Sequence, residues 1–152
     1  MTPSELPFTF QAAEAADLPV IEALLTAAGL PLEGVRDHLA GFVLARRGSE
    51  VVGTAALERH GRHALLRLVA VRGDQRGTGL GQALAKERIR QAREEELDSL
   101  VLLTTTAEGF FPRFGFTRIA REEVPPSLLA SRELQGVCPA SSVILRLDLT
   151  TH

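Results

Sequence analysis

The sequence predicts a mixed α/β domain whose central sheet is mostly antiparallel and flanked by helices. Across its 152 residues, short runs rich in Val, Leu and Phe alternate with longer runs that carry apolar residues at helical spacing. Glycine-containing dipeptides separate three consecutive apolar runs, which is typical of hairpins. A further apolar run follows a long helix, and such a crossover predicts a parallel strand pair.

The first quarter of the chain predicts one strand and two helices. Residues 8–12 predict a short strand. A helix over residues 17–28 is expected because apolar residues recur at helical spacing, at Leu18, Ile21, Leu24, Leu25 and Ala28. Asp17 is a plausible N-cap for this helix, and Gly29 is a plausible stop. Residues 32–39 predict a second, short helix.

Three strands are expected to follow as a meander through two glycine turns, over residues 42–46, 50–58 and 64–71. Gly48-Ser49 separates the first two strands, and Gly61-Arg62 separates the second from the third. Each turn predicts an antiparallel hairpin.

The second half of the chain predicts two helices and three strands. A long helix is expected over residues 80–96, and strands over 99–104, 116–119 and 142–149. Apolar residues share one helical face between the first two of these strands, at Ala107, Phe110, Phe111 and Phe114, with Pro112 in the first turn or distorting the helix. Pro125-Pro126 opens a segment with a short helix. The expected order is therefore β-α-α-β-β-β-α-β-α-β-β in a single domain over residues 1–152.

Composition excludes several function classes. The net charge is −2 and no run of Lys or Arg is present, which argues against nucleic acid or an anionic membrane as partner. Cys138 is the only cysteine, so neither an intrachain disulfide nor a zinc site of several thiolates can form. The single cysteine is typical of a reducing compartment. The N-terminus does not resemble a signal peptide, and no apolar stretch is long enough to span a bilayer. We therefore expect a cytoplasmic protein.

A glycine-rich turn joins a strongly apolar strand to the long helix, in the order Arg76-Gly77-Thr78-Gly79-Leu80-Gly81-Gln82. The first N–H groups of a helix lack partners inside it and, with the helix dipole, favour a phosphate. The turn has no lysine, which excludes a P-loop, and its spacing fails the strict dinucleotide pattern. The alternative is a turn needed only for tight packing of the strand on the helix.

The pattern R-x-x-G-x-G, from Arg76 through Gly81, resembles the pyrophosphate-binding motif of the GNAT (GCN5-related) N-acetyltransferase superfamily. Members of that superfamily often carry N-x-x-A-x-x-F-Y-x-x-x-G-F after the fifth strand. The corresponding segment here begins at Thr104 and matches at Ala107, Phe110, Gly115 and Phe116, while Thr104 and Phe111 replace the Asn and the Tyr. The resemblance covers nearly the whole chain and includes the order of the elements.

This resemblance implies an enzyme that moves the acetyl group of acetyl-CoA to the amine of a small molecule, without a metal. In the superfamily, the fourth strand binds the pantetheine arm like an added strand and has a bulge near the thioester. The positions expected to contact acetyl-CoA are Leu68, Val69, Ala70, Val71, Arg76, Gly77, Thr78, Gly79, Leu80, Gly81, Gln82, Thr104 and Phe111. A backbone N–H around Val69 or Ala70 would polarise the thioester carbonyl. The alternative for residues 68–71 is a plain core strand, and both can hold because the backbone does the binding.

More narrowly, the chain is similar to arsenic-resistance-associated N-acetyltransferases. The similarity is carried by Gly29-Leu30-Pro31, Leu57-Glu58, Leu65-Leu66-Arg67, residues 102–108 with Phe110-Phe111, Val124-Pro125 and Cys138-Pro139. It implies an amino-acid-like or organoarsenical acceptor. The wider superfamily often pairs through C-terminal strands, so a homodimer is expected from the resemblance.

Glu58 is the candidate general base, which would remove a proton from the acceptor ammonium. If Gly61-Arg62 is a two-residue turn, Glu58 lies opposite Leu65 and shares a face with Arg67 and Val69. Arg67 is unusual in an apolar strand and needs a partner or solvent. Its planar fork suits an acidic group of the acceptor. The alternative for both residues is a structural Glu58–Arg67 ion pair.

The tyrosine that often protonates the departing thiolate in the superfamily is replaced by Phe111, which cannot do so. A hydrogen bond from Thr104, Thr105 or Thr106, or a water molecule, would have to replace it. Loss of the tyrosine also leaves open a non-catalytic acetyl-CoA sensor. His60 and His63 flank the expected turn, so we expect both to be solvated, and with His38 they show no metal-binding spacing.

Overall fold

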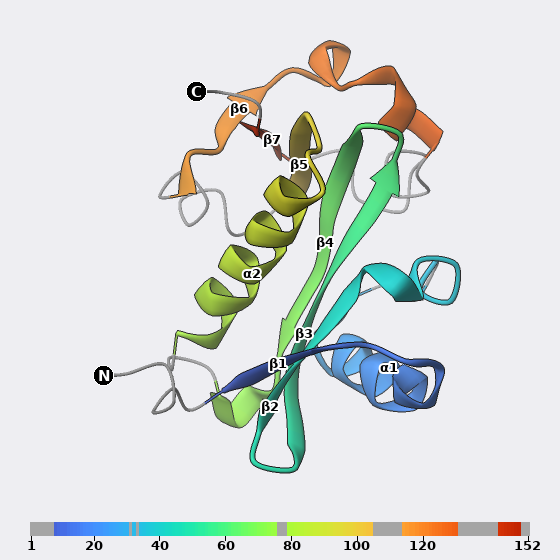
Figure 1. Ribbon diagram of the computed structural model, residues 1–152, viewed down its shortest axis with the longest axis vertical. Coiled ribbons are helices and arrows are strands. Elements are labelled where there is room, and N and C mark those ends of the chain that lie inside the picture. Colours follow the sequence, from blue (N-terminus) through green and yellow to red (C-terminus); the bar gives the residue numbers. More distant parts are fainter. Residues whose placement is uncertain are drawn as a thin grey trace. The chain divides into compact units, whose positions relative to one another are not determined.

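The computed structural model describes residues 8–30, 32, 34–75, 79–104, 114–130 and 143–149. It contains the strands β1 (Thr9–Ala12), β2 (Phe42–Arg47), β3 (Glu50–His60), β4 (His63–Val71), β5 (Ser99–Thr104), β6 (Thr117–Ile119) and β7 (Val143–Asp148), and the helices α1 (Leu18–Ala27) and α2 (Leu80–Glu94) (Figure 1). The strand order in the sheet is β1-β2-β3-β4-β5-β7-β6. Neighbours pair antiparallel wherever a register is defined, except for the parallel pair β4–β5 that follows the α2 crossover. The predicted mixed, mostly antiparallel class is confirmed.

The chain divides into two compact units, one formed by Met1–Ala56 with Leu68–Arg88 and the other by Leu57–Arg67 with Ile89–His152. Strands β3 and β4 and helix α2 each contribute residues to both units.

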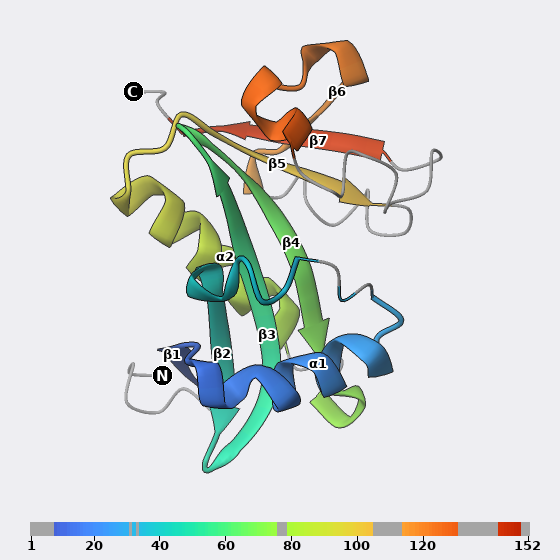
Figure 2. The same cartoon turned by 90° about the vertical axis from the view of Figure 1, so that its right-hand side faces the viewer.

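In the first unit, helices cover both faces of the strands (Figures 1 and 2). Helix α1 packs on one face in a group that we call the α1-side cluster, formed by Ile21, Leu24, Leu25, Val35, Phe42, Leu44, Ala56 and Ala70. The start of α2 packs on the other face in the α2-side cluster, formed by Phe8, Val43, Ala45, Val52, Ala55, Leu80 and Leu84, with Val69 and Val71 against it. The two faces follow from the alternation of side chains along each strand.

Helix α1 ends where the sequence predicts. Gly29 adopts φ of +73°, a left-handed conformation that glycine reaches without strain. The N–H of Leu30 donates to the carbonyl of Leu25 at 2.9 Å, the long bond of a Schellman-type helix end. Asp17 occupies the N-cap position of α1, but its carboxylate accepts from the backbone N–H of Glu14 at 2.8 Å instead of capping α1.

The second helix predicted over residues 32–39 is wrong. Residues 34–38 form turns, and a short 3-10 helix follows at Leu39–Gly41. Gly34 adopts φ of +81°, which a right-handed helix cannot contain. The apolar spacing that suggested a helix arises because Val35 is buried in the α1-side cluster while Leu39 packs against it.

The second unit is built on β5, β7 and β6. Strand β5 pairs with β7 along its whole length, from Ser99↔Asp148 to Thr104↔Val143. Its core cluster consists of Leu65, Val101, Ile119, Val124, Leu128 and Ile144. Leu128 belongs to the short 3-10 helix Pro126–Ala130, which lies where the sequence predicts a short helix. The apolar residues of β5 and β7, two strands that the sequence predicts, thus supply Val101 and Ile144 to this core.

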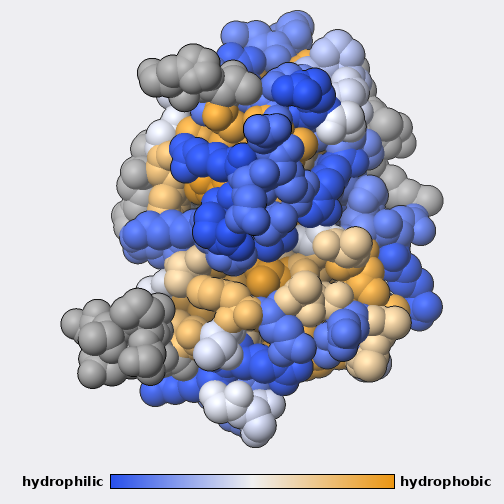
Figure 3. All heavy atoms as spheres, viewed as in Figure 1, coloured by the Kyte–Doolittle hydropathy of each residue, from blue (hydrophilic) through white to orange (hydrophobic). Residues whose placement is uncertain are grey.

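The solvent-facing side of α2 is hydrophilic (Figure 3). Lys86, Arg90 and Glu94 are exposed along it, four residues apart, and Arg90 and Glu94 form an ion pair. The opposite side of the helix supplies Leu80 and Leu84 to the α2-side cluster. Within the described part of the chain, no helix is long and apolar enough to cross a membrane.

Candidate active site

The turn between β3 and β4 aligns the candidate acceptor residues. β3 ends at His60 and β4 begins at His63, and Gly61 between them has φ of +67°. The two-residue turn predicted at this point is confirmed. Since side chains alternate along a strand, Glu58 and His60 lie on one face of β3 and Arg59 lies on the other.

Arg59 shows this alternation directly. Its guanidinium donates to both carboxylate oxygens of Glu95, just after α2, at 2.5 and 2.6 Å. The hydrogen bond from Arg59 to Glu95 raises the pKa of Arg59, so Arg59 stays cationic. Arg59 is therefore committed to an ion pair on the face opposite Glu58 and takes no part in the candidate site.

Glu58 and Arg67 form a buried ion pair in the second unit. Nη1 of Arg67 donates to Oε1 of Glu58 at 2.5 Å, and both side chains are 3% exposed. The contact is diagonal across two neighbouring strands, as the predicted register requires. The ion pair that the sequence left as an alternative is thus present. A buried carboxylate and a buried guanidinium each need such a partner, because removal from water is costly for an isolated charge.

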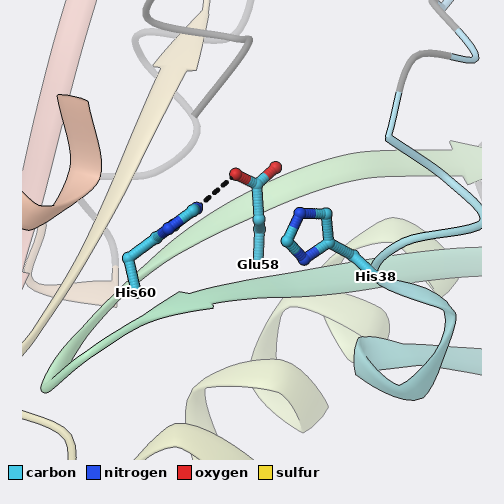
Figure 4. A group of neighbouring side chains, drawn as sticks. All are labelled: His38, Glu58 and His60. Carbon is cyan, nitrogen blue, oxygen red and sulfur yellow. Dashed lines mark hydrogen bonds and ion pairs between the residues drawn. The ribbon is translucent and has the colours of Figure 1, made fainter. Parts of the chain in front are cut away.

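His60 completes the group. Its Nε2 shares a 2.5 Å hydrogen bond with Oε2 of Glu58 (Figure 4). The side chain of His60 is 17% exposed, so the expectation of a solvated histidine is wrong. We call Glu58, Arg67 and His60 the Glu58 array. His60 could have been found from the sequence, since it lies two residues from Glu58 on the same strand and therefore on the same face.

His63, at the other end of the turn, has a different partner. Its Nδ1 shares a 2.7 Å hydrogen bond with Oγ of Ser99, a buried residue at the start of β5. The solvated state expected for His63 is therefore also wrong. The two histidines that flank the turn are similar in burial, but only His60 contacts the candidate base.

The pairing of β4 with β5 is short. It covers His63↔Ser99, Ala64↔Leu100 and Leu65↔Val101, although β4 continues to Val71. Among the described residues, the remaining part of β4 has no pairing with β5. Backbone groups along such an edge are a template for an added extended chain.

Val69 lies on the face opposite Glu58. Ala56, two residues before Glu58 on β3, belongs to the α1-side cluster, and so does Ala70. Val69 packs against the α2-side cluster instead. The prediction that Val69 shares the face of Glu58 is therefore wrong.

Strict alternation breaks between Arg67 and Ala70. Arg67 reaches Glu58 and so points to the face of β3 that carries Glu58. Ala70 points to the same face and lies three positions after Arg67. In a regular strand, two side chains share a face only when they are an even number of positions apart. An extra residue in this stretch, as in a β-bulge, accounts for both side chains and for the reversed orientation of Val69.

The described part of the glycine-rich turn begins at Gly79, which has φ of +85°. The first bond of α2 runs from the N–H of Ala83 to the carbonyl of Gly79 at 3.0 Å. The N–H groups of Leu80, Gly81 and Gln82 precede it and have no acceptor within the helix. A Cβ on Gly81 would meet only Cγ2 of Val71, at 3.8 Å, so packing does not demand glycine at this position.

Several predicted site residues lie outside the described residues, namely Arg76, Gly77, Thr78, Thr105, Thr106 and Phe111. The helix expected around Pro112 lies largely outside them as well. Thr104 is the last residue of β5 and pairs with Val143.

Comparison with known proteins identifies a family. A family model described as "Acetyltransferase (GNAT) domain" matches residues 38–118, more than half of the chain. An uncharacterized N-acetyltransferase of Chlorobaculum tepidum is 28% identical over 98 residues, which make up 64% of this chain and 63% of that protein.

Solved structures share the fold. The N-acetylglutamate synthase of Neisseria gonorrhoeae, complexed with coenzyme A and N-acetyl-glutamate, superposes with a TM-score of 0.81 and 24% identity, over 97% of this chain and 36% of that one. The Rv2747 protein of Mycobacterium tuberculosis, solved with CoA, superposes with a TM-score of 0.74 and 23% identity, over 93% and 99%. The chain thus spans about a third of the synthase and less than two thirds of the Chlorobaculum relative. On the match over residues 38–118, the chain belongs to the GNAT acetyltransferase family.

Proposed function

We propose that this acyltransferase moves the acetyl group of acetyl-CoA to the amine of a small molecule, by direct attack of the amine on the thioester. The observation that carries the proposal is the buried Glu58 array, because it places a buried carboxylate and a buried guanidinium in contact on neighbouring strands. Membership of an acetyltransferase family and coenzyme A in solved structures of the same fold support acetyl-CoA as the cosubstrate.

The cofactor half of the proposal uses backbone groups. The pantetheine arm would pair with β4 beyond Leu65, where the pairing with β5 stops. The pyrophosphate would bind the first N–H groups of α2, helped by the helix dipole and by Arg76, Gly77 and Thr78. The N–H of Val69 would polarise the thioester carbonyl, since a bulge turns a backbone donor away from its strand partner. Thr104 and Phe111 belong to this half on the sequence pattern alone.

The acceptor half uses side chains. Glu58 would take a proton from the acceptor ammonium, after which the neutral amine attacks the acetyl carbon and the thiolate of coenzyme A leaves. Arg67 would both hold Glu58 and attract an acidic group of the acceptor, because a guanidinium recognises planar oxyanions. Amino-acid-like amines and amine-bearing organoarsenicals have that chemistry. The N-acetyl-glutamate bound to the gonococcal enzyme is an example of the first kind.

The arsenic-resistance assignment and the homodimer rest on the sequence resemblance, and so does a single domain over residues 1–152. For this reason the acceptor panel should contain both amino acids and organoarsenicals, and the activity should be measured at several protein concentrations.

The test is the release of free thiol from acetyl-CoA across that panel, with acetyl-CoA affinity measured in parallel by calorimetry. We expect thiol release above the acceptor-free rate with at least one amine that carries a carboxylate or an arsenic acid group. Acetyl-CoA binding without thiol release on any amine would instead establish a non-catalytic sensor.

A further inference from the structure

The three members of the Glu58 array differ in their access to solvent. The side chains of Glu58 and Arg67 are each 3% exposed, and that of His60 is 17% exposed. Both carboxylate oxygens of Glu58 are engaged, Oε1 with Arg67 and Oε2 with His60. The Glu58 carboxylate is almost fully buried, so a proton that binds to it has little direct access to water. It can leave through a side chain that is hydrogen-bonded to the carboxylate.

Of Arg67 and His60, only His60 can accept that proton. A guanidinium such as that of Arg67 is a donor at every nitrogen and offers no nitrogen that accepts a proton. The imidazole of His60 can accept a proton at one ring nitrogen and release another from the opposite nitrogen. The more exposed member of the array is thus also the one with the chemistry to pass a proton on.

We propose that His60 relays the proton from Glu58 to water, an inference that rests on the proposed role of Glu58 as the base. Glu58 first accepts the proton from the acceptor ammonium and becomes a neutral acid. The ring of His60 starts as the Nδ1–H tautomer, so its bare Nε2 then takes this proton, which restores the Glu58 carboxylate and makes an imidazolium. The imidazolium loses the proton on Nδ1 to water, and proton exchange with water returns the ring to the Nδ1–H tautomer before the next turnover. No oxidant or co-reactant is needed, and charge is conserved at each step.

A purely structural role for His60 predicts different behaviour. In that case the ring would serve only to donate a hydrogen bond to Oε2 and fix the Glu58 side chain. The amide of glutamine can donate such a bond but cannot carry a proton at neutral pH. His60→Gln therefore separates the relay from the positioning role.

His63 provides a matched control in the same chain. It flanks the same two-residue turn and is similarly half-buried, but its ring binds Ser99 and not Glu58. His63→Gln should therefore perturb the turn as much as His60→Gln does, but it should leave the proposed proton transfer from Glu58 to His60 unchanged.

The kinetic experiment compares acetyl transfer over many turnovers by the wild type, His60→Gln, His60→Ala, His63→Gln and Glu58→Gln, because Glu58 must lose its proton before each new turnover. We expect His60→Gln and His60→Ala to transfer about tenfold more slowly or worse, within the range of lost acid–base catalysis. Added imidazole should speed up His60→Ala but not Glu58→Gln. His63→Gln should transfer at the wild-type rate, and all variants should bind acetyl-CoA with unchanged affinity.

A second readout needs no acceptor. The ring nitrogens of His60 and His63, observed by nitrogen-15 NMR, report their protonation and hydrogen bonds. Glu58→Gln should change the signals of His60 and leave those of His63 in place. Unchanged His60 signals would overturn the relay, because the ring would then not be coupled to the carboxylate.

The kinetic outcomes distinguish a failure of the His60 relay from a failure of Glu58 as the base. If Glu58→Gln is slow while His60→Gln transfers at the wild-type rate, the relay is wrong and the proposed base stands. If Glu58→Gln itself transfers at the wild-type rate, the proposed base is wrong and the relay fails with it.

Discussion

The two ends of β4 differ in their surroundings and in the roles that we propose for them. At its beginning, β4 pairs with β5 and supplies the side chain of Arg67 to a buried ion pair. Beyond Arg67 it has no pairing with β5 among the described residues, and its side chains pack into apolar clusters while its backbone edge remains the candidate cofactor site. One end therefore depends on the chemistry of individual side chains, and the other depends on backbone geometry.

This difference decides what substitutions should do. At the side-chain end, even an isosteric change should be costly, since it removes a charge from a buried pair. At the backbone end, replacing one apolar residue with another should leave coenzyme A binding unchanged. Only a substitution that adds bulk near the cofactor or removes a backbone N–H should weaken this binding. The experiments below test this contrast, beginning with the largest effect.

Replacing Glu58 with glutamine should lower kcat/KM by about 10²–10⁴, the usual contribution of a general acid–base group. The affinity for acetyl-CoA should not change, because Glu58 lies on β3, whereas the proposed cofactor contacts are backbone groups of β4 and of the start of α2. Thiol release and calorimetry measure the two quantities. Glu94→Gln is the control, since Glu94 is an exposed glutamate paired with Arg90.

A Glu58→Gln enzyme that keeps full activity would show that the ion pair is only structural. A parallel loss of acetyl-CoA affinity would instead show that the two ends of β4 are not separable.

Replacing Arg67 with methionine should destabilise the fold by about 3–5 kcal/mol, the cost of leaving a buried charge without its partner. Adding Glu58→Met should recover most of this loss, because the second change removes the stranded carboxylate. Urea denaturation of the single and double variants gives both free energies of unfolding. A double variant no more stable than the Arg67→Met single variant would mean that packing, not charge, explains the loss.

At the backbone end, Gly81→Ala should weaken coenzyme A binding by about tenfold, or about 1.4 kcal/mol, by blocking close approach of the pyrophosphate. The fold should tolerate the change, since the new Cβ meets only Cγ2 of Val71 at 3.8 Å. Gly73→Ala is the control, because a Cβ there meets nothing within 4 Å and lies outside the proposed cradle. Equal affinities for coenzyme A in the two variants would remove Gly81 from the cradle.

The smallest effect is expected at the exposed Arg62–Asp98 pair beside the turn. The hydrogen bond from Arg62 lowers the pKa of Asp98, so the ionised pair favours the folded state. Its contribution is present above the unfolded pKa, near pH 4, and is lost as the pH falls through the lower folded value. The Tm difference between wild type and Asp98→Asn should therefore shrink to nothing in acid. A Tm difference that does not depend on pH would show that it does not arise from the charge of Asp98.

Much of the fold can be predicted because local patterns agree with the final packing. The hairpin turns at Gly48-Ser49 and Gly61-Arg62, the helix stop at Gly29 and the extent of β5 are as expected. Counting back from the second turn also places Glu58 and Arg67 on one face of neighbouring strands, where they form their ion pair. Turn geometry and alternation suffice for such short-range contacts.

Three predictions are wrong for physical reasons that local sequence patterns did not reveal. The helix over residues 32–39 fails because Gly34 takes a left-handed conformation that its residue type permits but does not require. The predicted face of Val69 is wrong because the prediction assumed strict alternation along β4, although the resemblance implies a bulge in this strand. The prediction for His60 is wrong because a position beside a turn favours a solvated side chain, although the spacing from Glu58 favours a shared face.

The division of β4 into a side-chain end and a backbone end is tested most directly by titrating the nitrogen-15-labelled protein with coenzyme A. We predict the largest amide shifts at Leu80, Gly81 and Gln82 and along β4 beyond Arg67, with the same pattern and affinity in Glu58→Gln. Shifts confined to other parts of the chain, or a pattern abolished by Glu58→Gln, would contradict the account.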